Sequence, residues 1–245
     1  MTEFVLPSIF FVVAFIYSSV GLGGGSSYTA IMAIMGVSYT FIPTTSLTLN
    51  LVVTFIGMVN FWRKGYGRIN LIIPFLLTSV PITYLASTMD LPEIIFKIIL
   101  ISTLILVTVR LYIFNSLTLS FHLSGINKWL VIIGLGSTLG FIAGSVGIGG
   151  GIYLVPLIVM FGLGTEKEAS AAGAMFIWAN SLVGVVARIQ SGTFDSNFIL
   201  PLVIVVLIGG FFGSYLGAFK LKSKIIQQIM GGVVIVAIIL LVKGL

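Results

Sequence analysis

Two short glycine runs are the residues of this sequence whose spacing most directly suggests a chemical task. The first is GLGGGS at residues 21–26, and the second is GIGGG at residues 147–151. Glycine permits positive φ and close approach of a ligand to the backbone. A helix that restarts after such a run presents free N–H groups and the positive end of its dipole, which bind anions without a buried cation. The pattern therefore predicts two backbone anion sites.

Other functions of glycine runs have to be weighed against this one. A phosphate-binding P-loop needs Lys followed by Ser or Thr after its glycines, and a preceding strand, and residues 21–26 offer neither. The remaining alternative is close packing of membrane helices. Repetition of the motif at matching positions favours the anion sites. The predicted backbone site consists of Gly21, Gly23, Gly24, Gly25, Ser26, Gly147, Gly149, Gly150 and Gly151.

Polar side chains inside apolar stretches form the second group of candidates. Asn50 and Asn180 follow the glycine runs at similar places, and a carboxamide donates to an anion or accepts from a cation. The alternative is an interhelical hydrogen bond, worth about 0.6 kcal/mol. The predicted side-chain site consists of Thr45, Ser46, Asn50, Asn180 and Ser181. Arg188 lies near a helix end, where we expect it to extend to the membrane interface, with contact to an anion in a vestibule as the alternative.

The remaining chemistry of the chain is sparse. There is no Cys and one His, His122, which argues against thiol chemistry and against most zinc sites. Every Asp and Glu lies near the end of an apolar stretch, so we expect no acid–base pair and no membrane-embedded proton carrier. We therefore expect no metal, no cofactor and no enzyme activity. The formal charge of +6 comes without a basic, aromatic patch, which excludes a nucleic-acid partner.

The candidate residues belong to a chain that predicts a membrane protein. Hydrophobic residues make up 58% of it and charged residues 7%, whereas soluble domains carry about 25% charged residues. A membrane helix needs roughly 20 apolar residues. Long stretches free of Asp, Glu, Lys and Arg include 4–62, 69–89, 129–165, 196–219 and 225–242. We expect an all-α, multi-pass protein of the plasma membrane.

The sequence repeats itself. Residues 15–25 read FIYSSVGLGGG and residues 141–151 read FIAGSVGIGGG, with eight of eleven positions identical. We therefore predict one transport domain, 1–245, made of two homologous halves, 1–120 and 121–245, as in many secondary transporters. The apolar units are 4–36, 42–62, 70–88 and 93–114 in the first half, and 129–162, 168–188, 197–219 and 224–243 in the second.

The first unit of each half is too long for one crossing. A continuous helix over 4–36 would run about 50 Å, and glycines interrupt it. We predict a broken or re-entrant hairpin followed by three transmembrane helices in each half, which makes the halves an inverted repeat. The basic clusters around Arg63 and Lys222 then both face the cytoplasm, as the positive-inside rule favours. A single crossing by each first unit is the alternative, and it places the clusters on opposite sides.

The paired motifs SVGLGGG and SVGIGGG resemble those of the sulfite exporter TauE/SafE family. In that family a Pro, a Gly and an Ala-x-Gly-Thr-Ser-Leu segment usually follow. This chain has Pro156, Gly162 and AAGAMF at 171–176 in its second half. Its first half has TSL at 45–47 and no such Pro. The resemblance covers nearly the whole chain and implies a plasma-membrane carrier of small anions, often sulfur oxyanions or organosulfonates.

These observations favour secondary transport of a small anion by alternating access around a site at the glycine turns. A passive anion channel and a carrier of small organic carboxylates are the alternatives. The expected partners are the anionic substrate and the lipid bilayer, with homo-oligomer formation left open.

Overall fold

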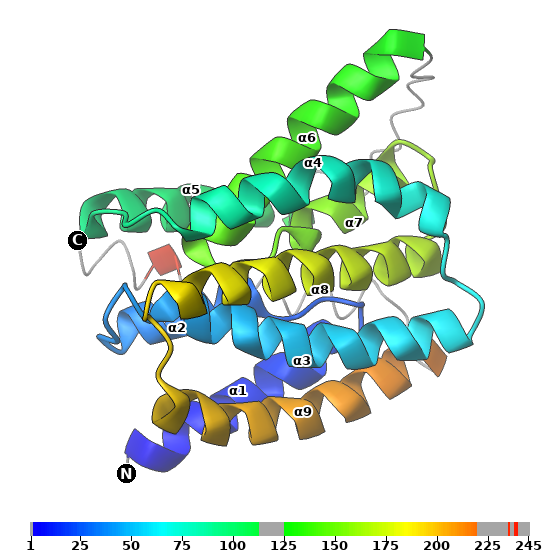
Figure 1. Cartoon of the computed structure of the whole chain (residues 1–245). Coiled ribbons are helices and arrows are strands. Elements are labelled where there is room, and N and C mark those ends of the chain that lie inside the picture. The colour runs from blue at the N-terminus through cyan, green and yellow to red at the C-terminus, as the bar shows by residue number, and fades with distance from the viewer. Residues whose placement is uncertain (1, 113–124, 220–234, 236–237, 240–245) are drawn as a thin grey trace.

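The computed structural model describes residues 2–112, 125–219, 235 and 238–239. The elements assigned within these residues are all α-helices, which confirms the predicted fold class (Figure 1). The helices are α1 (Thr2–Ser18), α2 (Gly25–Ile34), α3 (Ile42–Arg63), α4 (Ile69–Ser87), α5 (Glu93–Tyr112), α6 (Gly125–Val146), α7 (Gly151–Met160), α8 (Glu166–Gln190) and α9 (Ser196–Phe219).

Five helices of the described residues are long and apolar enough to cross a membrane, namely α3, α4, α8, α9 and the Trp129–Val146 part of α6. Large apolar side chains on them are exposed, such as Leu77 (69%) and Ile204 (62%). An apolar exterior of this kind suits lipid rather than water. The predicted span over 93–114 is helical as α5, and the one over 224–243 lies almost wholly outside the described residues.

Both over-long units are broken at their glycines, as predicted. In the first, α1 ends at Ser18 and α2 begins at Gly25. The chain folds back there, because the rings of Phe10 and Tyr28 lie 4.7 Å apart and the Tyr17 hydroxyl lies 2.8 Å from Ser27 Oγ. In the second, α6 and α7 are separated by the turn that contains Gly147 and Gly149.

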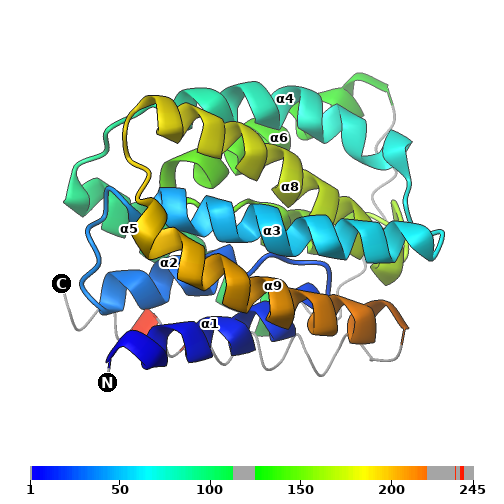
Figure 2. The ribbon, with the colours of Figure 1, turned by 60° about the horizontal axis from the view of Figure 1, so that its bottom comes forward.

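The two halves exchange helices. Helix α9 packs along α1, and α6 packs along α4, with α3 and α8 between these pairs (Figures 1 and 2). A row of glycines lets the backbones meet. A Cβ atom on any of these glycines would touch or overlap the backbone or side chain of the partner helix. The facing residues are Gly136 with Phe75, Gly140 with Ser79 and Gly144 with Thr83, and Gly209 with Phe11, Gly213 with Phe15 and Gly217 with Ser19.

The central helices α3 and α8 run antiparallel. Thr44, near the start of α3, shares a 3.0 Å hydrogen bond with Thr193, just beyond the end of α8. In the same register, Gly184 faces Leu47 and Gly57 faces Ala174. The pairs α1–α9 and α4–α6 are parallel, since their contacts advance together along both helices. Antiparallel α3 and α8, together with parallel α1–α9 and α4–α6, are what two halves that run in opposite directions would give. The inverted orientation of the halves in the bilayer stays a prediction.

Candidate substrate site

The two short helices begin at left-handed glycines. Gly24 caps α2 with φ of 93°, and Gly150 caps α7 with φ of 71°. Residues with a Cβ rarely adopt this conformation, so glycine is what permits the helix to restart abruptly. The restart falls at Gly25, one residue before the position near Ser26 that the sequence suggests.

Both helix starts carry unpaired backbone donors. Within the described residues, the N–H groups of Gly25 and Ser26 on α2 and of Ile152 on α7 have no acceptor, while the N–H of Tyr28 already bonds Gly24 O. Ten-residue helices such as α2 and α7 place a partial positive charge at these starts. The arrangement suits an anion with several oxygen acceptors.

The two turns touch each other. A Cβ atom on Gly25 would lie 2.9 Å from Gly147 O and 2.8 Å from Ile148 O. Both carbonyls belong to the turn of the second half. The predicted convergence of the two glycine runs at one place is therefore present in the fold.

Asn50 of α3 lies between the two turns. It is fully buried, and its Nδ2 donates to Gly147 O at 3.3 Å. A Cβ on Gly23 or Gly25 would overlap its amide, and one on Gly149 would lie 3.1 Å from Nδ2. Asn50 Oδ1 has no donor among the described residues, so the amide keeps acceptor capacity for a ligand hydroxyl, a water or a cation.

Ser46 and Thr29 strengthen the link between the turns. Ser46 Oγ donates to Gly147 O at 2.8 Å, and Thr29 Oγ1 donates to Ser46 Oγ at 3.1 Å. The second-turn carbonyl is thus already neutralised by protein donors. Thr45, the neighbour of Ser46, is buried in the same turn of α3. Sequence reasoning missed Thr29, although its place one helical turn after Gly25 signals it.

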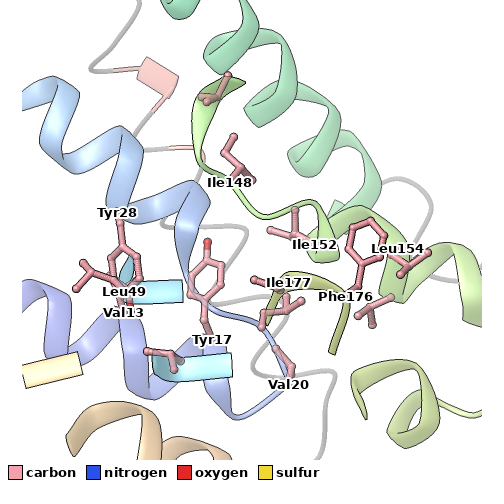
Figure 3. Packing of buried hydrophobic residues seen from close by; sticks show 14 of the residues in the cluster. Val13, Tyr17, Val20, Tyr28, Leu49, Ile148, Ile152, Leu154, Phe176 and Ile177 are labelled. Atoms are coloured by element: carbon pink, nitrogen blue, oxygen red, sulfur yellow. The ribbon is translucent and has the colours of Figure 1, made fainter. Parts of the chain in front are cut away.

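The remaining candidates of the first turn contact other helices. The Ser26 hydroxyl shares a 3.1 Å hydrogen bond with Tyr17 OH, a buried residue that the sequence did not single out. Gly21 lies against the Ser170 backbone of α8. Tyr17 of α1 and Tyr28 of α2 are buried side chains of the first hairpin itself (Figure 3).

Asn180 and Ser181 of α8 are buried but engaged differently from Asn50. Asn180 Oδ1 accepts from Thr83 Oγ1 at 2.6 Å, and its Nδ2 donates to Phe176 O at 2.8 Å. Neither partner belongs to a glycine turn, so Asn180 ties α8 to α4. Ser181 Oγ has no partner among the described residues.

Apolar side chains take the corresponding place in the second half. A Cβ on Gly150 would lie 2.9 Å from the Phe176 ring, and one on Gly151 would lie 2.5 Å from Ile177 Cδ1. Figure 3 shows Phe176 and Ile177 in the buried hydrophobic cluster. Gly149 and Gly151 meet Ile177 in the second half as Gly23 and Gly25 meet Asn50 in the first. These contacts identify Ile177, rather than Asn180, as the counterpart of Asn50.

Arg188 does not extend to the membrane interface, and that expectation was wrong. Only 6% of the residue is exposed, and its Nη2 donates to Gly144 O at 2.7 Å and to Ser145 O at 3.3 Å. The C-terminal carbonyls of α6 hold the cation inside the protein, because they are the negative end of that helix.

Comparisons with known proteins agree with these features. The family model described as sulfite exporter TauE/SafE matches residues 6–241. The chain is 30% identical over 252 residues to the probable membrane transporter protein y4hK of Sinorhizobium fredii, covering 98% of this chain and 96% of that protein. It is 35% identical over 101 residues to the probable membrane transporter protein YunE of Bacillus subtilis, covering 40% and 36%. No solved structure matches the chain.

The relatives are named as membrane transporters rather than enzymes, and five helices of the described residues can span a bilayer. The protein is a multi-pass transporter of the plasma membrane, and the chain belongs to the sulfite exporter TauE/SafE family.

Proposed function

We propose that this transporter moves a small anion, a sulfur oxyanion or an organosulfonate, by alternating access around the two glycine turns. The observation that supports it is the meeting of the α2 and α7 starts beside the buried amide of Asn50. The N–H groups of Gly25, Ser26 and Ile152 at these starts have no acceptor in the part of the chain that the structure describes. Backbone dipoles in a low-dielectric surrounding attract an anion without a charged side chain.

The class of anion follows from this donor set and from the name of the family. Oxyanions of sulfur present several acceptor oxygens, which match N–H groups that come from two helix starts. The bound substrate would be released readily, because neutral donors hold an anion less tightly than Arg or Lys would.

Alternating access is supported by the origin of the two turns. Gly24 belongs to the first half and Gly150 to the second, and the described side-chain bonds that join the turns run through Ser46, Asn50 and Thr29. Movement of one half against the other would change the side from which the anion is reached.

Reconstituted vesicles test the proposal. Uptake of labelled sulfite, thiosulfate or methanesulfonate should saturate with concentration, and unlabelled substrate inside the vesicles should accelerate it. Flux that rises linearly and shows no counterflow would instead support an anion channel. Preference for acetate or a similar carboxylate over all sulfur anions would assign the carrier to organic acids.

A further inference from the structure

A second anion-binding feature lies away from the contact between the glycine turns. A cavity of about 440 Å³ opens between the segment before α3, the loop between α4 and α5, and the ends of α6 and α8. It lies at the end of α8 opposite to Glu168, which pairs with Arg68. Pro43 and Ser145 line its inner wall, and Pro43 Cα would lie 2.7 Å from a Cβ on Gly147. Pro43 therefore lies between the cavity and the second glycine turn.

Arg188 lines this cavity as a buried cation that no described carboxylate contacts directly, although Asp90 of the same cavity attracts it from a longer distance. Its Nη2 bonds two carbonyls, but its Nε is buried and has no acceptor among the described residues. No described carboxylate lies within ion-pair distance, 4.0 Å, of its guanidinium. A buried charge that is only partly compensated is costly, and an anion that bonds the Nε–H would offset that cost.

The other walls indicate what kind of anion fits. Tyr39 lines the cavity and its phenol supplies a further donor, while Pro43, Met89 and Phe96 form an apolar wall. An inorganic sulfate would leave this wall unoccupied. A short alkyl chain attached to the anionic group would cover it and gain from the hydrophobic effect.

We propose that the cavity binds a small organic anion, with its sulfonate or carboxylate on Arg188 and its alkyl chain against Pro43, Met89 and Phe96. From here the anion passes to the glycine turns. This inference rests on the proposed function for the identity of the anion as the transported substrate, but binding itself is measured without transport. Asp90 also lines the cavity and keeps the affinity moderate by repelling the anion.

The test measures binding of sulfate, methanesulfonate, butanesulfonate and butylammonium to the purified full chain by calorimetry. Butanesulfonate should bind more tightly than sulfate, and butylammonium should not bind. R188Q should weaken butanesulfonate binding roughly 10- to 150-fold through loss of a charged hydrogen bond. R188K should retain part of the affinity. R68Q is the matched control, since Arg68 is exposed at the other end of α8, and it should bind as the parent does.

D90N is a second test that leaves the bonds of Arg188 intact. Removal of this negative charge should strengthen butanesulfonate binding about two- to fivefold at low salt, and less at high salt. An unchanged affinity in D90N overturns the inference even if R188Q fails to fold. So does a folded R188Q that binds within twofold of the parent, or a parent that binds none of the anions.

The same variants separate this inference from the proposed function. Vesicles in which the parent and R188Q take up anions with equal affinity refute the Arg188 site and leave the proposed function standing. Arg188-dependent binding in a protein that moves no anion across vesicles refutes the proposed function and supports the cavity as a binding site.

Discussion

Asn50 shows at the scale of single residues how one side chain links two distant motifs. Its amide contacts glycines 23 and 25 of the first run and bonds the carbonyl of Gly147 in the second. Deletion of the amide would remove a polar group from the proposed site, while Gly147 O would keep the hydrogen bond from Ser46 Oγ. Asn180, in contrast, is paired with Thr83.

We expect Asn50→Leu to weaken substrate affinity by about tenfold or more, because a buried hydrogen-bonding group is lost from the proposed site. Asn60→Leu is the matched control, since Asn60 lies on the same helix and bonds Ser214 of α9. Asn180→Leu should lower thermal stability with little change in affinity. Concentration-dependent uptake and unfolding in detergent measure both effects. Equal affinities in all three variants would contradict the role of Asn50.

Gly24→Ala and Gly150→Ala should reduce substrate affinity roughly 10- to 150-fold, because an added methyl group displaces the backbone from the anion and removes a charged hydrogen bond. Positive φ alone disfavours alanine, so the control positions must also have positive φ. Gly36 (φ 76°) and Gly162 (φ 63°) meet this condition, and a Cβ atom on either would meet open space.

Uptake is compared among these four alanine variants, each normalised to the folded fraction by size-exclusion chromatography. The Gly36 and Gly162 variants should transport almost as the parent does. If the Gly24 and Gly150 variants match them, the substrate path lies elsewhere.

At the scale of helices, the glycine rows on α6 and α9 decide which helices pair. Lipid offers no hydrophobic drive for helix association, so close backbone contact at small residues selects the partner. Gly140 lies against the Ser79 backbone of α4, whereas Gly134, two turns earlier on α6, faces open space.

We therefore expect Gly140→Ala to destabilise the fold by about 1–3 kcal/mol through overpacking. Gly134→Ala should be neutral or stabilising by up to about 1 kcal/mol through helix propensity. Thermal unfolding of the two variants in the same detergent measures the difference. A Gly140 variant as stable as the Gly134 variant would show that α6 and α4 are not held at this row.

The sequence predicts where these helices begin and end better than it predicts which helices they pack against. The predicted spans 42–62 and 70–88 end within one residue of α3 and α4, because charged residues at 63–68 and 90 stop the apolar runs. Partner choice was not predictable in this way, since apolarity alone does not distinguish α9 from α8 as the neighbour of α1. The glycine rows on α6 and α9 are the residues that determine which helices pair.

The part of the candidate site that consists of backbone, the two glycine turns, was predictable from the sequence. Both glycine turns follow from residue type and repetition, and their left-handed caps agree with it. The roles of Asn180 and Arg188 were not predictable from the sequence, because the burial and the hydrogen-bond partners of these side chains depend on the packing of α4 and α6 against α8. Ile177, the counterpart of Asn50, was overlooked because the offset between the halves changes from 126 at Gly36 and Gly162 to 127 at Gly65 and Gly192.

On the scale of the whole molecule, the antiparallel α3 and α8 lead to a prediction of topology. The chain has no cysteine, so single cysteines report accessibility. Ser38→Cys, before α3, should react with an impermeant thiol reagent in intact cells. Gly65→Cys, after α3 and beside Arg63 and Lys64, should react only after permeabilisation. Labelling of both from outside, or of Gly65→Cys alone, would exclude the predicted orientation.

The exchange of helices between the halves also has a consequence for synthesis. Helix α1 leaves the ribosome first, but the glycine face that it packs against belongs to α9, Ser196–Phe219. Sequential insertion therefore leaves α1 without its main partner until nearly the whole chain has been made, and closure of so long a loop is slow. Chaperoning of α1 by the insertion machinery, rather than early folding of the first half, would govern the yield of active protein in the cell.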